Sequence, residues 1–282
     1  MYKFLLKIIF LLLLILLIVF IILGGGFGQK NDNIQLNNGL PLIFAHRGLS
    51  NFAENSLESL IESKKNGFKA FEIDICFTKD NKLLVFHDKS CKRLLDINQD
   101  VTDLDFQKIK NEFIYLNGQK TKNKILTLEE VFSTFKQSQI LYLDIKNSSK
   151  TLADSLLYLI RKHKVQKNVL IADSNILFLI YLKTKNPEIA VVLEGFNKGK
   201  EWIYYLIPKN FKADYYSSFL SEVDAQHIHF LKDKNLLKRK IVYGINNENL
   251  KIANDLGIQN VIIDFDSSKD SYSNLANSFT KN

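Results

Sequence analysis

Residues 43–88 read IFAHRGLSNFAENSLESLIESKKNGFKAFEIDICFTKDNKLLVFHD. Three short apolar runs in this stretch predict strands, and polar side chains suited to binding or proton transfer stand at or near the end of each run. These side chains are His46, Arg47, Glu72, Asp74 and His87. Glu72 and Asp74 are two residues apart, so on a strand they point to the same side. The stretch therefore predicts strand ends that carry a cluster of charged groups.

The same alternation continues along the chain. Apolar runs that predict strands are Leu42–Ala45, Ala70–Cys76, Leu83–His87, Ile140–Ile145, Val169–Ala172, Ile189–Leu193, Lys240–Ile245 and Asn260–Asp264. Apolar residues at three- and four-residue spacing predict helices over Ser56–Lys65, Leu128–Lys136, Leu152–Lys162, Asn175–Lys183, Val223–Lys234 and Glu248–Asp255. Strands that alternate with helices predict a parallel sheet of the α/β class, and eight such strands can close into a (β/α)₈ TIM barrel. A ninth run, Ala213–Ser217, implies that one run lies outside the barrel or is not a strand.

The barrel is expected to occupy residues 41–266. The 282 residues, of which 46% are hydrophobic, suffice for one large core. Residues 29–40 predict a polar connector, and residues 267–282 predict a polar tail. Residues 89–127 are charged and irregular, and they predict an insertion after the third strand.

Residues at a further strand end join the predicted cluster. Asp144 and Lys146 repeat the two-residue spacing at the end of the fourth strand. Because such a barrel has its active site at the carboxyl ends of its strands, these distant residues are expected to converge. Carboxylates are the ligands that hard cations such as Mg²⁺ or Ca²⁺ prefer, and imidazole titrates near neutral pH. The sequence therefore predicts a site that holds a divalent metal against a phosphate and transfers protons beside it.

The first 28 residues differ from the rest of the chain. Phe4–Leu23 is almost wholly apolar, and about 20 apolar residues can span the hydrocarbon layer of a membrane. Lys3 and Lys7 lie at its start, which predicts a cytoplasmic N-terminus and an exported body. Residues 24–28 (GGGFG) offer the small residues that a signal peptidase prefers. Two hypotheses remain: an anchor with the barrel on the extracytoplasmic side, or a cleaved signal that leaves the barrel secreted or periplasmic.

Charge and cysteine content give weaker expectations. The net charge of +8, or +6 without residues 1–28, fits contact with anionic lipids or substrates, and equally a solvated surface. No basic run with interleaved aromatic residues indicates nucleic acid. Cys76 and Cys91 are too few for a disulfide framework, so two separate thiols are expected rather than one disulfide.

Eight sequence blocks together resemble the glycerophosphodiester phosphodiesterase family, in the family's order. The blocks are AHRG (45–48), ENS (54–56), FEIDICFTKD (71–80), VFHD (85–88), LTLEEVF (126–132), LDIK (143–146), VYGIN (242–246) and VIIDFD (261–266). No block is specific alone, but their joint order over about residues 41–266 is. The resemblance implies a metal-dependent (β/α)₈ barrel that hydrolyses glycerophosphodiesters to an alcohol and glycerol 3-phosphate. It also implies the family's insertion after the third strand, where residues 89–127 fall.

The resemblance gives roles to the clustered residues. Glu72, Asp74 and Asp144 would bind the divalent metal, Mg²⁺ or Ca²⁺. His46 and His87 would be the catalytic acid and base: one takes a proton from the attacking hydroxyl, which in some members is the glycerol's own, and the other protonates the leaving oxygen. The three remaining histidines, on helix-like or adjoining segments, are expected to be structural: His163, His227 and His229.

Four further residues are expected around the substrate. Arg47 would bind the phosphate oxygens, with a rim ion pair as the alternative reading. Lys146 matches the family's catalytic-site lysine, which neutralises phosphate charge. Asn55, in the ENT-type block, is expected on the substrate side, where it orients its neighbours. Tyr243 would pack on glycerol or on a headgroup.

The chain departs from the family pattern at a few positions. Ala53 and Ser56 replace a proline and a threonine of the ENT-type block, which are mild changes. Asp144 replaces a glutamate and is one methylene shorter, as in the related sphingomyelinase D branch. Tyr243 and Gly244 replace the aromatic residue and the threonine of the WTVN-type block, so the pocket wall is altered.

These departures leave several functions to compare. The first is hydrolysis of glycerophosphodiesters, which would make the chain a phosphoric diester hydrolase. Its alternative is a lysophospholipase D-type or sphingomyelinase D-like hydrolase of membrane lipids, which would release the headgroup from a lysolipid. A non-catalytic barrel that binds a phosphoester is a third reading. A structural membrane protein would explain the N-terminal segment but none of the strand-end charges.

Overall fold

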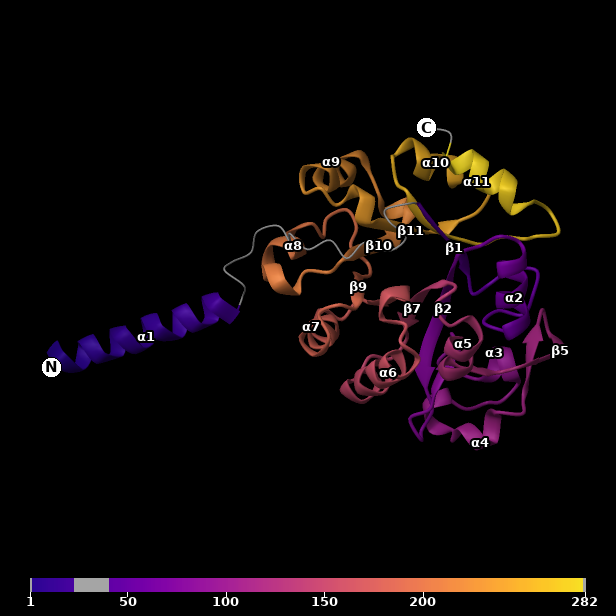
Figure 1. Ribbon diagram of the computed structural model, residues 1–282, viewed down its shortest axis with the longest axis horizontal. Coiled ribbons are helices and arrows are strands. Elements are labelled where there is room, and N and C mark those ends of the chain that lie inside the picture. Colours follow the sequence, from indigo (N-terminus) through magenta and orange to yellow (C-terminus); the bar gives the residue numbers. More distant parts are fainter. Residues whose placement is uncertain (1, 23–40, 281–282) are drawn as a thin grey trace.

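In the computed structural model, which describes residues 2–22 and 41–280, eight parallel strands form a closed barrel with helices around it (Figure 1). Strand β12 pairs with β1, and β1 pairs with β2, which closes the ring. The predicted (β/α)₈ barrel is confirmed. In the order of their neighbours its strands are β1 (Leu42–His46), β2 (Ala70–Phe77), β7 (Ile140–Ile145), β8 (Val169–Asp173), β9 (Ala190–Leu193), β10 (Tyr215–Phe219), β11 (Lys240–Ile245) and β12 (Asn260–Ile263).

Amphipathic helices cover the outside of the barrel. On the helix at Lys150–His163, Leu152, Leu156 and Ile160 recur every fourth residue and are buried, and the Ser149 hydroxyl accepts a hydrogen bond from the Leu152 amide at 3.0 Å. This spacing explains why the segment is a helix and why one side of it faces the strands. The helices that follow barrel strands are α2 (Leu57–Lys65), α5 (Leu128–Phe135), α6 (Lys150–His163), α7 (Ile176–Lys185), α8 (Trp202–Leu206), α9 (Ala225–Asp233), α10 (Leu250–Asp255) and α11 (Tyr272–Thr280).

Alternate residues of each strand fill the inside of the barrel. Leu42 and Phe44 on β1 belong to this inner core, as do Ile140 and Tyr142 on β7. The intervening residues pack against the helices instead, since successive side chains of a strand point to opposite faces. This alternation fixes which residues point into the barrel where the strands end.

The third predicted strand is not part of the barrel. Strand β3 (Leu83–Val85) runs antiparallel to β2, so β2 and β3 form a hairpin at the barrel's edge. The ninth run supplies the missing barrel strand, β10. The expectation that one of the nine runs lies outside the barrel is confirmed, and that run is Leu83–His87. The sequence does not say which run it is, because a buried apolar run has the same pattern in an antiparallel hairpin as in a parallel barrel.

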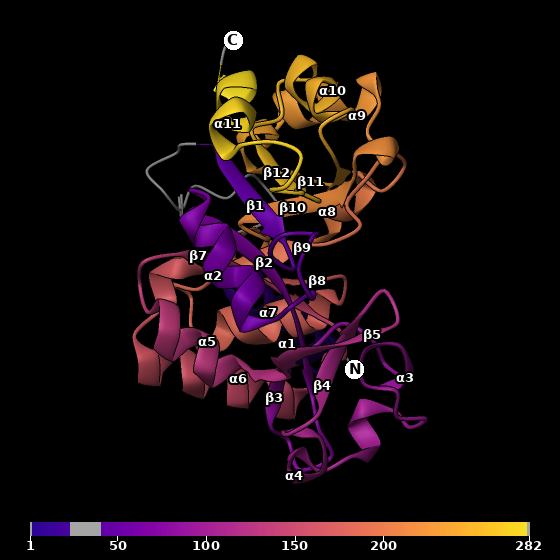
Figure 2. The same ribbon diagram turned by 90° about the vertical axis from the view of Figure 1, so that its right-hand side faces the viewer.

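The insertion has a small core of its own. It follows β3 and contains α3 (Lys92–Leu95), α4 (Phe106–Ile109), β4 (Phe113–Leu116), β5 (Gln119–Lys124) and β6 (Leu126–Thr127). Of these, α3, α4, β4 and β5 lie together in Figure 2. Leu84, Phe86 and Ile109 are buried in this core with Cys76 and Cys91. Both cysteines are free thiols, as expected, and burial raises the pKa of Cys91 to about 11.

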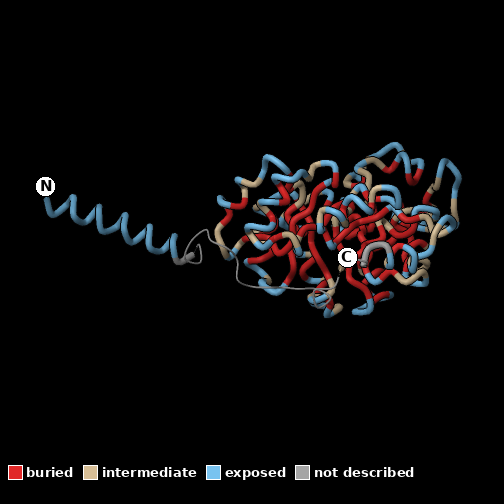
Figure 3. The backbone as a smooth tube through the Cα atoms, turned by 90° about the horizontal axis from the view of Figure 1, so that it is seen from above, coloured by how far each residue is buried: buried red, intermediate tan, exposed pale blue. Residues whose placement is uncertain are grey.

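The two ends of the described chain differ in burial. Helix α11 falls in the predicted polar tail, yet Leu275 is buried and Tyr272 packs on Phe68, with ring centroids 4.6 Å apart. Helix α1 (Tyr2–Ile22) is apolar except for Lys3 and Lys7, and its residues 2–20 are exposed (Figure 3). Among the described residues it is the helix long and apolar enough to cross a membrane. The predicted connector 29–40 and the small residues 24–28 lie outside the described residues.

Candidate active site

The inward-facing positions at the carboxyl ends of the strands surround one cavity of about 480 Å³. His46 follows Leu42 and Phe44 on the inner face of β1, and Asp144 follows Ile140 and Tyr142 on that of β7. The pairing of the strands sets His46 beside Glu72. All the predicted site residues line this cavity except Asn55 and Asp74, which are buried beside the lining residues.

Three of the predicted residues form an acidic cluster. Carboxylate oxygens of Glu72, Asp74 and Asp144 all lie within 4.8 Å of one another. Burial, and then the charges of Asp74 and Asp144, raise the pKa of Glu72 well above its usual range. Burial likewise raises the pKa of Asp144. Three buried carboxylates repel one another, so a positive charge among them is needed to keep them ionised.

Lys146 supplies such a positive charge in this structure. Its Nζ lies 2.9 Å from Asp74 Oδ1 and 2.6 Å from Asp144 Oδ2. Asp74 Oδ1 is buried, and its polar contact is the ion pair with Lys146 Nζ. Burial opposes the charge on Lys146, but Asp74 and Asp144 raise its pKa. A cluster whose candidate ligand atoms are all carboxylate oxygens fits the preferences of Mg²⁺ or Ca²⁺.

The histidine on β1 is held by the neighbouring strand β12. His46 Nδ1 lies 2.6 Å from Asp264 Oδ1, and Nε2 lies 3.8 Å from Glu72 Oε2. Burial opposes ionisation of Asp264, yet the bond to His46 lowers the pKa of that carboxyl. An ionised carboxylate only accepts hydrogen bonds, so Nδ1 of His46 carries a proton. In the neutral ring Nε2 is then free to accept a proton in the cavity.

The second histidine reaches the cavity from the insertion. The hairpin of β2 and β3 turns the chain back, so that the Phe86 amide donates to the Asp74 carbonyl at 3.0 Å and His87 follows at the mouth. His87 Nδ1 lies 2.7 Å from Asp88 Oδ1. Arg93 donates two hydrogen bonds to Asp88, both 2.7 Å, and chiefly these lower the pKa of Asp88 to about 2. His87 therefore also carries its proton on Nδ1.

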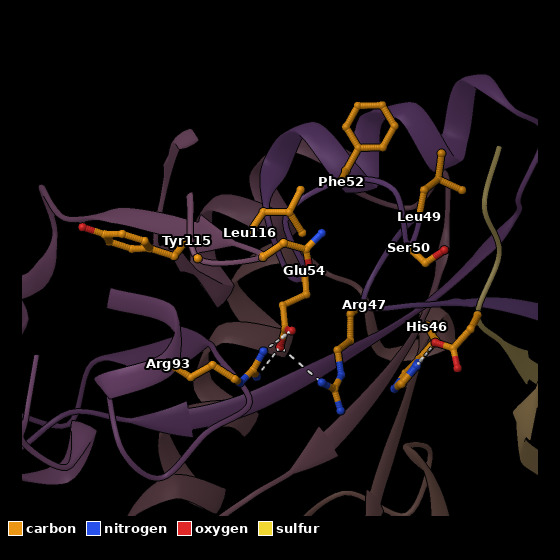
Figure 4. A pocket seen from close by; sticks show the side chains of 12 residues that line it. His46, Arg47, Leu49, Ser50, Phe52, Glu54, Arg93, Tyr115 and Leu116 are labelled. Carbon is orange, nitrogen blue, oxygen red and sulfur yellow. Dashed lines mark hydrogen bonds and ion pairs between the residues drawn. The ribbon is translucent and has the colours of Figure 1, made fainter. Parts of the chain in front are cut away.

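Charged side chains connect the insertion to the loop after β1. Arg93 donates to both oxygens of Glu54, at 2.6 and 2.9 Å, and Arg47 Nη1 donates to Glu54 at 3.2 Å. Figure 4 shows Glu54 between the two arginines. Arg47 Nε also lies 3.0 Å from Asp74 Oδ2. Burial opposes the charge of Arg47, but Asp74 and Glu54 raise its pKa. This network ties both histidine-bearing segments to the acidic cluster.

The backbone of the loop after β1 is specialised for this network. Arg47 has φ 55° and Gly48 has φ 89°, in the left-handed region where glycine is favoured. A Cβ on Gly48 would lie 2.0 Å from Ser59 Oγ, so any larger residue would displace α2. The tight turn lets the Arg47 amide donate to Glu72 Oε2 at 3.0 Å.

Asn55 is buried beside the lining residues and contacts Asp74. It is 1% exposed, its Nδ2 donates to Asp74 Oδ2 at 2.7 Å, and its Oδ1 accepts from the Asp74 amide at 3.3 Å. Its side chain therefore orients Asp74, a metal-ligand candidate, which fits the expectation that Asn55 orients its neighbours. The structural histidines also lie away from the cavity lining: His227 bonds Glu201 at 2.7 Å and His163 packs beside Phe132.

The opposite wall of the cavity is aromatic. The rings of Phe219 and Tyr243 meet edge to face, with centroids 4.4 Å apart. Gly244 has φ 73°, and a Cβ there would lie 3.1 Å from the Phe219 ring. The glycine that replaces the family's threonine thus makes room for Phe219. Tyr243 keeps the predicted place on this wall.

Several cavity residues were not predicted from the sequence. Glu194 follows the inner residues Ala190 and Val192 of β9, and its Oε1 lies 2.7 Å from the Tyr142 hydroxyl. Burial and the Asp144 charge raise the pKa of Glu194 to about 8. Asp264 was read only as a strand end. The sequence signal that could have identified Glu194 and Asp264 is their two-residue spacing from the apolar residues that point into the barrel.

A second hollow of about 360 Å³ adjoins the main cavity (Figure 4). It lies between the loop after β1 and the turn that joins β4 to β5, and shares His46 with the main cavity. Phe52, Tyr115 and Leu116 line it. Glu54 also lines the hollow, and Arg47 and Arg93 neutralise its charge. The hollow thus extends the site toward the insertion, and its walls combine charged and polar residues with a few apolar ones.

Comparison with known proteins agrees with this geometry. A model of the glycerophosphoryl diester phosphodiesterase family matches residues 46–267. A glycerophosphodiester phosphodiesterase of Bacillus altitudinis is 32% identical over 114 residues, which are 38% of this chain and 45% of that protein. The human lysophospholipase D GDPD3 is 27% identical over 177 residues, which are 57% of this chain and 54% of that protein. The chain spans about half the length of the curated relatives it matches.

Solved structures show the same fold. A phosphodiesterase of Oleispira antarctica, in complex with the product sn-glycerol-3-phosphate, has a TM-score of 0.71 and 23% identity. The match covers 81% of this chain and 94% of that chain. The family match includes both histidines, the acidic cluster and the closing strand of the barrel. The chain belongs to the glycerophosphoryl diester phosphodiesterase family.

Proposed function

We propose that the chain hydrolyses glycerophosphodiesters to an alcohol and glycerol 3-phosphate in a metal-dependent reaction. The observation that carries the proposal is one cavity in which an acidic cluster lies beside two histidines, each with Nδ1 bound to a carboxylate. Proteins of this name among its relatives, and the product named with the Oleispira antarctica structure, support the same substrate class.

Glu72, Asp74 and Asp144 would hold the Mg²⁺ or Ca²⁺ ion. A bound divalent cation neutralises the charge of the phosphodiester and acts as Lewis acid and template. Arg47 and Lys146 add positive charge at the same place, and Arg47 can bind phosphate oxygens in a forked geometry. Asn55 keeps Asp74 oriented through two hydrogen bonds.

The histidines would transfer protons on the two sides of the phosphate. The Nε2 of one would accept the proton of the attacking hydroxyl, from water or from the glycerol, as its oxygen bonds to phosphorus. Attack by the glycerol hydroxyl would give a cyclic phosphate, which a water molecule would then open to glycerol 3-phosphate. The protonated Nε2 of the other gives its proton to the alcohol oxygen as the second P–O bond breaks. Asp264 and Asp88 hold each ring with Nε2 toward the cavity and stabilise the protonated form.

A lysophospholipid is the second candidate substrate. Two observations favour it: the apolar helix α1 and the human relative named as a lysophospholipase D. In our proposal the glycerol of the substrate packs against Tyr243 and Phe219. The alcohol on the other side of the phosphate binds in the second hollow. In this reading α1 anchors the chain with the barrel on the extracytoplasmic side. If α1 is a cleaved signal, the barrel is secreted or periplasmic.

The test is release of free alcohol from a panel of glycerophosphodiesters and lysophospholipids, with and without each metal. We expect metal-dependent release from glycerophosphocholine or a lysolipid, with glycerol 3-phosphate or its acyl derivative as the other product. Release of choline from lysophosphatidylcholine alone would favour the lysophospholipase D reading. Binding of the diesters without release of any alcohol would instead identify a non-catalytic barrel.

A further inference from the structure

Helix α8 exposes an apolar face. Trp202, Tyr205 and Leu206 are 59%, 51% and 65% exposed, whereas Tyr204 on the same helix is buried. The three exposed residues are spaced i, i+3 and i+4, so they lie on one side of the helix. Single exposed apolar residues are ordinary on soluble surfaces, but three adjacent ones on one short helix are typical of an interaction surface.

Positive charges flank this face. Lys198 and Lys200 precede the helix and are exposed, and Lys209 follows it. Glu201, the acidic residue at the helix start, is bonded to His227. Tryptophan and tyrosine favour the interface between water and membrane, where lysines bind anionic headgroups. We call Trp202, Tyr205, Leu206, Lys198 and Lys200 the α8 patch.

The α8 patch lies at the catalytic end of the barrel. Helix α8 follows β9, whose end carries Glu194 in the cavity wall, and a helix after a barrel strand begins at the catalytic face. The next rim positions are apolar as well. Leu177, at the start of α7, is 77% exposed, and Phe219, at the end of β10, is 50% exposed. Exposed apolar side chains therefore recur along the rim from β8 to β10.

The same chain carries a helix of membrane-spanning length. Helix α1 includes a 19-residue apolar window, Tyr2–Phe20, none of which is buried. Residues 23–40 join it to the barrel, and a chain of that length reaches at most about 60 Å at about 3.5 Å per residue. A barrel linked to a bilayer in this way remains within contact distance of its surface.

We propose that the α8 patch lies in the headgroup region of the bilayer that holds α1, so that the mouth of the barrel faces the membrane surface. The occupant is a lipid bilayer with anionic lipids, because aromatic, leucine and lysine side chains together match that interface. This contact is separate from the hydrolysis proposed above and would hold whichever diester the cavity accepts.

The chain's single tryptophan makes the proposal directly measurable. Trp202 is the only tryptophan in the sequence, so intrinsic tryptophan fluorescence reports on α8 alone. The full chain would be reconstituted in vesicles of phosphatidylcholine and phosphatidylglycerol, with or without bromine on the acyl chains. We expect the brominated lipids to lower Trp202 emission by about twofold or more, since an interfacial helix buries its apolar face beside the acyl chains. Emission that bromine leaves unchanged, together with full quenching by iodide in the water, would overturn the proposal.

Variants separate the α8 patch from the rest of the surface. Tyr205→Ser with Leu206→Ser should abolish the bromine quenching, whereas Ile252→Ser, at an equally exposed residue of α10, should leave it unchanged. A tryptophan moved to α6, by Trp202→Phe with Tyr158→Trp, should escape bromine quenching. Quenching of that displaced tryptophan would refute the proposed orientation. A second copy of the chain could instead cover the α8 patch. In that case Trp202 emission would be blue-shifted without bromine quenching and the particle would have doubled mass, and this result would also overturn the proposal.

Discussion

The two halves of the candidate site are built by different means. On the barrel side, His46 occupies an inner position of β1, and Asp264 of the adjacent strand β12 binds it. On the insertion side, His87 lies in a loop beyond β3, and its partner Asp88 is its own neighbour in the sequence. Barrel register alone places the first histidine. The second depends on a hairpin and on the bonds from Arg93.

This difference indicates which half of the site is held more rigidly by the fold. The barrel half is surrounded by buried strands, with Glu72 and Asp74 both nearly inaccessible to water. The insertion half is held by Arg93, whose side chain is 51% exposed and bridges Asp88 to Glu54. We therefore expect changes in the barrel half to act on chemistry directly. Changes in the insertion half should act through the position of His87.

Removing either histidine should have the largest effect. His46→Ala or His87→Ala should lower kcat by at least ~10²-fold, the usual loss for a general acid or base. The measurement is kcat for release of alcohol from glycerophosphocholine at saturating metal. His229→Ala, at an exposed histidine of α9, is the matched control and should leave kcat unchanged. Full activity in the double variant of His46 and His87 would contradict the proposed mechanism.

Removing the charge of each histidine's partner should have a smaller effect. Asp264→Asn or Asp88→Asn should cost about 10- to 100-fold in kcat, because each carboxylate fixes one ring orientation and tautomer. The two variants should differ in a second readout. Asp88→Asn also releases Arg93, so it should lower the protection of the insertion's amides from hydrogen exchange, and Asp264→Asn should not. Equal exchange in both variants would argue against separate control of the two halves.

Breaking the network at Arg93 should cost less again. Arg93→Ala leaves Asp88 and Glu54 without their shared partner, so His87 should be less well positioned and kcat should fall by roughly 10-fold. Arg93→Lys, which retains the charge but loses the paired hydrogen bonds, should restore only part of the activity. The free energy of unfolding in urea should change by less than about 1 kcal/mol, since the Arg93 side chain is half exposed to solvent, which screens its ion pairs. An unchanged kcat in Arg93→Ala would show that His87 needs no such support.

The smallest expected effect is on stability at low pH. The pKa of Asp88 is lowered to about 2 in the folded chain, chiefly by hydrogen bonds from Arg93. A lowered carboxyl pKa stabilises the fold fully above the ordinary value of about 3.9, and this contribution is lost as the pH falls toward 2. Unfolding free energy should therefore drop more steeply between pH 4 and pH 2, roughly, in the parent chain than in Asp88→Asn. If unfolding free energy falls with pH equally in the two proteins, Asp88 does not contribute to the acid sensitivity of the fold.

The sequence predicted the barrel and most of the site because both follow from strand periodicity. Glu72 and Asp74 point one way since a strand repeats every two residues, and Asp144 shares that geometry on β7. Which of the nine runs lies outside the barrel stayed open, because an apolar run such as Leu83–Val85 does not disclose whether its neighbour is parallel or antiparallel. The Arg93 network lies in irregular sequence, where no periodicity relates Glu54 to Asp88.

Some residues could have been found by a stricter use of register. Asp264 and Glu194 both continue an inner apolar row, Ile262 on β12 and Val192 on β9. Asn55 was found by resemblance, but only the structure shows that it binds Asp74 rather than facing the cavity. Its burial depends on the left-handed turn after β1, a feature that side-chain type alone does not encode.

The central claim is that a divalent cation held by Glu72, Asp74 and Asp144 is required to cleave a glycerophosphodiester in this cavity. The most direct measurement is release of glycerol 3-phosphate from glycerophosphocholine by metal-stripped protein, in chelator and after Mg²⁺ or Ca²⁺ is restored. The account predicts no release in chelator, recovery with at least one of the two ions, and no recovery in Asp74→Asn. Full release in excess chelator would contradict it.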